Sequence, residues 1–315
     1  MIRIEGLFKG LENNRALEID SLNIKGKGVY GLLGKDGAGK TTLLKILSGS
    51  SEYDSGSVSV CGHDVATEPM KVKYKVSSVP EAVGFFNEDT VYETLDFVGN
   101  AKNVPSERRY RQIKEALELV GLDGQRKKLC GELSPHEKKL LGIAVSLLGN
   151  PELILLDEPM KNESAEEKEE LAELIKMLGK HKTVIVSSSE PLDIEALCAH
   201  FVILSNGKCI LDSSAENIRS ALGSVRSLDM KLRGDVTRIV GWFENNKAIK
   251  KYSYSVDSEK TISVSFEYSS DTDMRENFRR GLKEIGADIV ACDGIMLSLS
   301  DVYCVLTHEA EEGDR

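Results

Sequence analysis

The chain has 315 residues, 41% hydrophobic and 29% charged, which is typical of folded globular proteins and excludes collagen-like, disordered and disulfide-scaffold classes. At about 100 to 200 residues per domain, this length predicts one large domain with a smaller one, or two comparable domains. The formal charge of −10 opposes broad attraction to nucleic acid, so we expect no nucleic-acid partner.

The apolar runs are short; Leu153–Leu156, for example, falls far below the roughly 20 residues that a membrane-spanning helix needs. The first residues alternate apolar and polar side chains and lack the apolar centre of a secretory signal. The six cysteines are scattered without CxxC spacing, which predicts reduced thiols. We therefore expect a cytoplasmic chain that does not cross the bilayer.

The first half of the chain predicts a strand, a glycine-rich turn and a helix in succession. Residues 28–33 form an apolar run typical of a buried strand, and leucines recur at helical spacing in residues 41–47. Residues 57–60 alternate as a strand, which predicts an antiparallel sheet with the N-terminal strand. The periodicity of residues 91–120 is helical.

The second half predicts a parallel sheet. Leu153–Leu156 and residues 183–186 are continuous apolar strands separated by a charged helical pattern at 166–178, as in a βαβ unit. Residues 201–204 and 208–211 flank an Asn-Gly turn and predict a hairpin. Together these elements predict an α/β domain with a parallel sheet, an antiparallel β subdomain and a helical subdomain.

A domain boundary is predicted near Gly223. Residues 1–222 would form the α/β domain, and residues 223–308 a small α+β domain. In the small domain we expect strands at 227–232, 261–266 and 287–291, and helices at 236–243, 274–285 and 299–306. Residues 309–315 are rich in carboxylates and predict a solvated acidic tail.

Residues 34–41 fit the pattern GxxxxGK[ST] and lie between a predicted strand and a predicted helix. In such a loop, glycines let successive backbone N–H groups curl around phosphates, and the helix presents its positive N-terminal end. Lys40 would reach the phosphates as a point charge, and Thr41 would bind Mg²⁺ through its hydroxyl. The alternative is a glycine-rich turn that matches the pattern by chance.

Two carboxylates, Asp157 and Glu158, follow the apolar strand Leu153–Leu156. At the end of a strand, Asp157 would hold the Mg²⁺ shell, and Glu158 would orient or deprotonate the water that attacks the γ-phosphate. The alternative is a pair of solvated acids that cap the strand. With the loop upstream, this pair completes a predicted nucleotide site.

These motifs make residues 1–222 resemble the ATP-binding subunit of an ATP-binding cassette (ABC) transporter. Residues 133–144 stand where that family has its LSGGQ signature and the following helix, and residues 298–303 resemble a motif in the accessory domain of the drug-export branch. The resemblance implies a P-loop NTPase fold of the ABC type, ATP and Mg²⁺ as cofactors, a membrane-spanning partner and a second cassette in a homo- or heterodimer.

The motifs and the resemblance together assign the site residues. Glu158 is the expected catalytic residue, and the expected Mg²⁺ ligands are Thr41, Glu81 and Asp157. The expected nucleotide-binding residues are Gly34, Lys35, Asp36, Gly37, Ala38, Gly39, Lys40, Thr41, Thr42, Ser134 and Ser189.

The chain departs from the family at the signature, which reads LSPHE at 133–137. Pro135 removes a backbone N–H, and His136 puts a side chain where glycine would admit a phosphate. Ser134 and Glu137 nevertheless form a capping-box pattern with proline at the first helical position, so the helix should start well. Two interpretations stay open: a sound helix with weakened function, or a signature that still grips phosphate through Ser134.

Four further positions differ from the family pattern. Ser189 replaces the switch histidine, and Glu81 replaces a glutamine, although a carboxylate also binds Mg²⁺. Ser164 replaces an aspartate, and Leu11 replaces the aromatic residue that stacks on adenine, where Phe8 could substitute.

We expect ATP hydrolysis by this chain to power a separate membrane protein, an exporter, from the cytoplasmic face of the membrane. Because the loss of one preorganised donor can cost roughly 10² to 10³ in rate, the alternative is a nucleotide-gated clamp or regulatory subunit with little turnover. A soluble cassette of DNA repair or translation would need paired cassettes or a long coiled coil, and the sequence has neither.

Overall fold

The computed structural model describes residues 1–10, 16–222, 226–256, 261–268 and 275–295, together with Leu299 and Tyr303. The chain divides into two compact units, and the division after β10 falls between Ser214 and Ala215. The domain limits that we expect, 1–222 and 223–308, stay predictions. The acidic tail at 309–315 and most of the expected helix at 299–306 lie outside the described residues.

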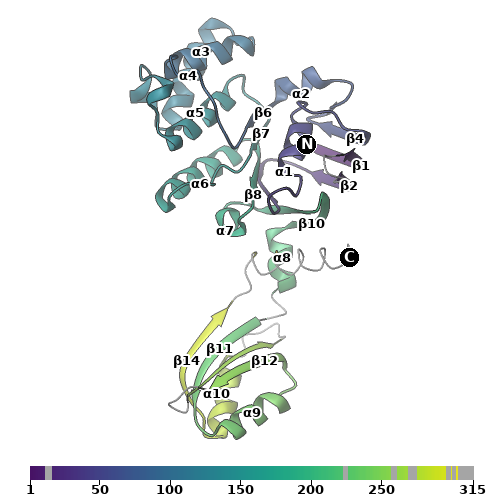
Figure 1. Ribbon diagram of the computed structural model, residues 1–315, viewed down its shortest axis with the longest axis vertical. Coiled ribbons are helices and arrows are strands. Elements are labelled where there is room, and N and C mark those ends of the chain that lie inside the picture. Colours follow the sequence, from purple (N-terminus) through teal and green to yellow (C-terminus); the bar gives the residue numbers. More distant parts are fainter. Residues whose placement is uncertain are drawn as a thin grey trace. The chain divides into compact units, whose positions relative to one another are not determined.

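The first unit is built on a ten-stranded sheet in the order β5-β4-β1-β2-β10-β9-β3-β8-β7-β6 (Figure 1). The strands β3, β6, β7, β8 and β9 pair in parallel, whereas β1, β2, β4 and β5 pair antiparallel. Both predicted sheet types are therefore confirmed. The strands are β1 Ile2–Gly10, β2 Ala16–Ile24, β3 Gly28–Leu33, β4 Ser55–Val60, β5 His63–Asp64, β6 Val76–Val79, β7 Leu153–Leu156, β8 Thr183–Ser188, β9 His200–Ser205 and β10 Lys208–Ser214.

Helix α1 (Lys40–Leu47) packs between the two parts of the sheet: its apolar face shares one core with the antiparallel strands and with Leu153 and Ile185 of the parallel strands. Around the parallel sheet lie α2 Pro69–Lys75, α6 Ala165–Gly179 and α7 Pro191–Ile194. The helical subdomain comprises α3 Val91–Ala101, α4 Ser106–Leu119 and α5 Pro135–Leu147 (Figure 1). No helix among the described residues is long and apolar enough to cross a bilayer.

The hairpin of β9 and β10 confirms its predicted turn. Asn206 and Gly207 have φ values of 48° and 82°, the left-handed conformations that a two-residue hairpin turn needs. The backbone N–H of Gly207 donates to Ala38 O at 3.2 Å, so the turn borders the glycine-rich loop.

The second unit begins with α8 Ala215–Leu222 and forms a four-stranded antiparallel sheet in the order β12-β13-β11-β14. Its chain order βαββαβ is that of a ferredoxin-like fold, so the small α+β fold is confirmed. Strand β12 escapes sequence reasoning because it is an edge strand with mostly exposed, polar side chains. The elements are β11 Arg226–Arg233, α9 Val236–Asn245, β12 Ile249–Val256, β13 Thr261–Tyr268, α10 Arg275–Glu284 and β14 Asp288–Ile295.

Cys61, Cys130, Cys198 and Cys209, whose side chains the structure describes, are free thiols, and Cys130 and Cys198 are buried. Burial raises the pKa of Cys61 and of Cys209 to about 11, and that of Cys198 further. Because the thiolate is the nucleophile, a pKa two units above normal leaves roughly a hundredth of the usual thiolate at pH 8. We expect iodoacetamide to label Cys61 and Cys209 at pH 8 about 100-fold more slowly in the folded protein than in urea, measured by peptide mass spectrometry; equal rates would contradict this burial.

Candidate nucleotide-binding site

The glycine-rich loop closes tightly between β3 and α1. Gly37 and Gly39 have φ values of 82° and 102°, in the left-handed region that favours glycine. A Cβ atom on Gly34 would lie 2.7 Å from Leu204 O and 2.9 Å from the Cβ of Ala38. The loop therefore keeps its curled path only with glycine at these positions, and it leads directly into the N-terminus of α1.

Lys40, at the start of α1, is only 5% exposed. Its Nζ donates to Gly34 O at 2.5 Å, across the loop, and lies 2.9 Å from Glu158 Oε1. The two motifs that lie more than 100 residues apart in the sequence thus meet in one buried ion pair. This pair places the Lys40 amine inside the loop whose backbone N–H groups would surround a phosphate.

Thr41 and Asp157 form the pair expected of a Mg²⁺ site. The hydroxyl of Thr41 donates to Asp157 Oδ2 at 2.7 Å, and the hydroxyl of Ser187 donates to Asp157 Oδ1 at 2.7 Å. Asp157 is 6% exposed and follows β7 directly. A hydroxyl beside a carboxylate supplies the hard oxygen donors that Mg²⁺ prefers, so the residues fit this ion.

Glu158 is buried and held by the end of β8, not solvated. It adopts φ 48°, a left-handed conformation that is uncommon for a residue with a side chain. Its N–H donates to Ser187 Oγ at 2.8 Å, and its Oε2 accepts from the backbone N–H of Ser189 at 3.2 Å. These contacts point the carboxylate at Lys40, which contradicts the alternative of two solvated acids capping a strand.

Comparison with known proteins identifies the family of this chain. The family model described as ABC transporter matches residues 17–161. Bacitracin transport ATP-binding protein BcrA of Bacillus licheniformis is 32% identical over 221 residues, which cover 70% of this chain and 71% of that protein. The chain belongs to the ABC transporter family of ATP-binding proteins. The predicted enzyme class, an ABC-type ATPase, agrees with this membership.

The similarity to one relative extends through the second unit. The uncharacterized ABC transporter ATP-binding protein YxlF of Bacillus subtilis is 26% identical and aligns with 98% of this chain and 100% of its own length. Among solved structures, a dimeric ATP-binding cassette in a post-hydrolysis state bound to ADP and Pi matches with a TM-score of 0.62 at 21% identity, covering 68% of this chain and 99% of that one. That likeness confirms the predicted ABC-type α/β fold.

The altered ABC signature caps α5. The hydroxyl of Ser134 accepts from Glu137 N at 3.1 Å, and Glu137 Oε2 accepts from Ser134 N at 2.7 Å, so the predicted capping box is confirmed. Ser134 itself is exposed. His136 turns into its own chain, where its ring contacts Glu163 at 2.5 Å and Glu170 at 3.2 Å. The helix is therefore sound, while the phosphate contact expected of Ser134 stays a prediction.

Lys139 of α5 fastens the loop that follows Glu158. Its Nζ donates to Pro159 O at 3.1 Å and to Lys161 O at 2.5 Å, and it lies 2.8 Å from Glu163 Oε1. Glu163 is 3% exposed and binds both Lys139 and His136. Residues 159–163 are thereby clamped to the signature helix; we call these contacts the Lys139 clamp.

Glu81 forms an ion pair in this structure. Its described ion-pair partner is Lys161, at 2.9 Å, and Lys161 also lies 3.8 Å from Asp36 of the phosphate loop. Glu81 as a Mg²⁺ ligand therefore stays a prediction. Ser189 contacts Glu158, through its backbone N–H and with its hydroxyl at 3.5 Å. The site so far unites Lys40, Thr41, Asp157, Glu158 and Ser189.

Four residues that contact this site were not predicted from the sequence: Ser187, Lys139, Lys161 and Glu163. Ser187 carries a weak signal, since it is a polar residue at the end of a fully buried strand. The other three are charged residues in helix or loop positions, where charge is common, and only the tertiary contacts reveal them. Leu11, expected near adenine, lies outside the described residues, and Phe8 is 41% exposed.

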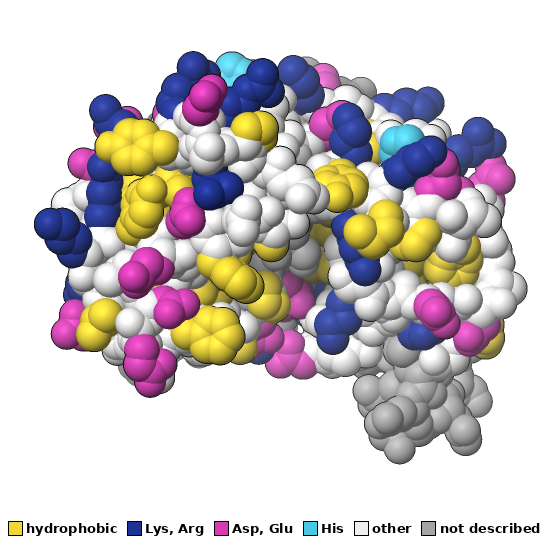
Figure 2. Space-filling view, turned by 90° about the horizontal axis from the view of Figure 1, so that it is seen from above, with side chains coloured by type: hydrophobic (Ala, Val, Ile, Leu, Met, Phe, Trp, Pro, Cys, Tyr) yellow, Lys and Arg dark blue, Asp and Glu magenta, His cyan; other side chains and the backbone are white. Residues whose placement is uncertain are grey.

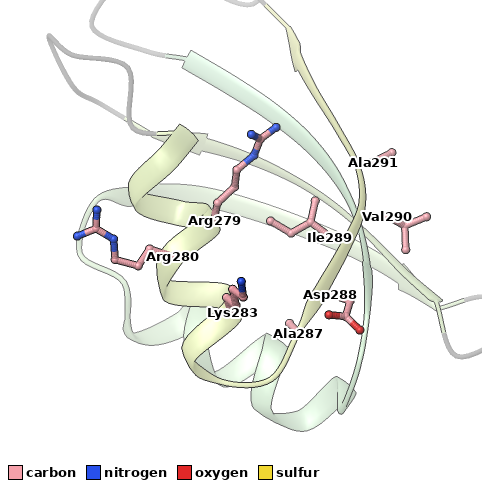
Figure 3. A pocket seen from close by; sticks show the side chains of 8 residues that line it. All are labelled: Arg279, Arg280, Lys283, Ala287, Asp288, Ile289, Val290 and Ala291. Carbon is pink, nitrogen blue, oxygen red and sulfur yellow. The ribbon is translucent and has the colours of Figure 1, made fainter.

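The second unit carries a cavity of about 570 Å³ between α10 and β14 (Figure 3). Arg279, Arg280 and Lys283 of α10 line it on one side, and residues 287–291 line it on the other. The lining contains one carboxylate, Asp288, and no glycine. It is therefore chemically distinct from the nucleotide site.

Proposed function

We propose that this chain binds and hydrolyses MgATP to drive a separate membrane-spanning subunit, and that the transport direction is export. The observation that carries the proposal is the buried contact of Lys40 with Glu158 beside the Thr41–Asp157 pair. A chain that used ATP only as a clamp would need the phosphate loop, but it would have no use for a carboxylate held at that position.

Each residue has a defined task in this reaction. Lys40 exchanges its contact with Glu158 for a phosphate oxygen, which frees the carboxylate for the attacking water. Thr41 and Asp157 hold Mg²⁺, which neutralises phosphate charge when it is bound. Glu158 orients the water and accepts its proton, a contribution of roughly 10² to 10⁴ in rate. Ser187 and Ser189 keep the Glu158 backbone and carboxylate in place.

A membrane-spanning subunit needs a docking surface on the cassette. Three large apolar side chains are exposed in or just before the helical subdomain. They are Phe86, which precedes α3, Phe97 on α3 and Tyr110 on α4, with exposed fractions of 72%, 66% and 57%. Figure 2 shows hydrophobic side chains exposed among both basic and acidic side chains on this view of the molecule. Patches of large exposed apolar side chains are typical of interaction sites, and we propose that these three side chains contribute to such a patch. The membrane subunit would hold the chain on the cytoplasmic face, paired with a second cassette, identical or different.

The proposed direction of transport is supported by the names of two relatives. BcrA is named for bacitracin transport, and a 28% identical protein of Bacillus subtilis is named linearmycin resistance ATP-binding protein LnrL. Resistance to an antibiotic is commonly achieved by removing it from the cell. These names support an exporter of a drug-like substrate.

A nucleotide-gated clamp is the second candidate, because His136 is turned toward Glu163 in its own chain and Pro135 lacks an N–H. Steady-state MgATP turnover by the purified chain with its membrane subunit separates the two. We expect Glu158→Gln to reduce turnover at least about 100-fold while ATP binding persists. Wild-type protein that binds ATP, dimerises with it and shows no turnover above that of Glu158→Gln would instead establish the clamp.

A further inference from the structure

Lys161 lies where three segments of the nucleotide site meet. It belongs to the loop after β7, and its Nζ lies 2.9 Å from Glu81, which follows β6, and 3.8 Å from Asp36 of the phosphate loop. The hydrogen bond with Glu81 raises the pKa of Lys161, and Glu158 adds to this through its charge. The ammonium therefore stays charged at neutral pH.

The positive charge of Lys161 offsets negative charge beside the phosphate loop. Asp36 and Glu81 are two exposed carboxylates beside a site for a polyanion, and like charges at this distance repel. The family's glutamine would be neutral at the position of Glu81, and its histidine could be positive at the position of Ser189. In this chain Glu81 is a carboxylate and Ser189 is uncharged, and Lys161 supplies a positive charge within 4 Å of both Glu81 and Asp36.

The backbone of Lys161 is held by hydrogen bonds at both its N–H and its carbonyl. Lys161 N donates to Glu158 O at 3.2 Å, and the Lys139 clamp holds Lys161 O at 2.5 Å. The side chain is 34% exposed, so its ammonium can exchange partners without moving the loop. A cation on a fixed backbone loses little conformational entropy when it binds.

We propose that Lys161 is a second phosphate-binding cation of this chain, which exchanges its ion pair with Glu81 and Asp36 for the γ-phosphate of bound ATP. The inference rests on the proposed function and deepens it, because it names the residue that distinguishes the triphosphate from the diphosphate. Lys40 reaches across the loop that would surround the phosphates of both nucleotides. Lys161 lies instead beside Glu81 and bonds through its backbone to Glu158, the residue proposed to act on the water at the γ-phosphate.

The test compares the affinities of AMP-PNP and ADP, each with Mg²⁺, by calorimetric titration of the full chain at about 0.1 M salt. We expect Lys161→Met to weaken AMP-PNP about tenfold, the loss of one charge-assisted hydrogen bond, and ADP less than about threefold. Lys176→Met is the matched control: Lys176 is 41% exposed and its Nζ lies 2.9 Å from Glu173, but it stands on α6. That control should leave both affinities unchanged.

Glu81→Gln provides a second arm. The glutamine removes the ion pair with Lys161, so we expect Glu81→Gln alone to bind AMP-PNP several-fold more tightly than the wild type. The same change added to Lys161→Met should give no such gain. Equal losses for AMP-PNP and ADP in Lys161→Met, or no loss, would overturn the role of Lys161 and leave the proposed ATPase function standing. A wild-type chain that binds neither nucleotide would overturn both, whereas absent turnover with intact discrimination would overturn hydrolysis alone.

Discussion

Lys40→Ala is expected to abolish measurable MgATP binding and to lower the free energy of unfolding by about 3 kcal/mol. Lys40 and Glu158 are each about 5% exposed, and their charged atoms lie 2.9 Å apart. Removing the ammonium leaves a buried carboxylate without its counter-charge, and it also removes the cation that spans the phosphate loop through Gly34 O. Calorimetric ATP titration and urea unfolding measure the two effects separately.

The chain supplies its own control for this change. Lys45 lies on the same helix, α1, but is exposed in its last turn, so Lys45→Ala should alter stability by less than about 0.5 kcal/mol and keep ATP binding. The double variant Lys40→Ala with Glu158→Gln should be more stable than Lys40→Ala, because the remaining buried group is neutral. A double variant with the sum of the two separate losses would show that the ion pair does not determine the stability of the site.

The local sequence patterns were sufficient to predict the loop and the strand on which the site is built. The run of glycines before Lys40 and the apolar strand before Asp157 each require a particular backbone, and parallel strands bring their carboxyl ends to one edge of the sheet. The meeting of Lys40 with Glu158 follows from that topology. Strand β12 could not be predicted in the same way, because its exposed edge position imposes no hydrophobic alternation on its side chains.

Some residues differ from the family pattern, and their interactions could not be predicted because these depend on neighbours in the tertiary structure. In the sequence, His136 stands where the family has a glycine. In the fold, its ring contacts Glu163, which lies 27 positions later in a loop. Glu81 reads as a metal ligand, yet its described partner is Lys161. Each charged residue has many possible ion-pair partners in the sequence. The actual partner is determined by how α5 packs with the loops that follow β6 and β7.

Glu163→Gln is expected to lower the free energy of unfolding by about 3 kcal/mol, because it removes the charge from the buried centre of the Lys139 clamp. Glu163 is 3% exposed, and both Lys139 at 2.8 Å and His136 at 2.5 Å depend on it. The loop that follows Glu158 should then shift, and a displacement of about 1 Å can cost roughly 100-fold in turnover. Urea unfolding and steady-state MgATP turnover report the two losses.

Glu170→Gln is the matched control, since Glu170 contacts the other nitrogen of the same histidine at 3.2 Å but is 56% exposed. An exposed pair contributes at most about 1 kcal/mol, so this variant should unfold at nearly the wild-type urea concentration and keep its turnover. If Glu163→Gln and Glu170→Gln behaved alike, His136 would be a surface substitution of the signature without a structural role. If only Glu163→Gln loses stability and turnover, the altered signature helix of this ABC protein supports the loop that follows Glu158 in its own chain.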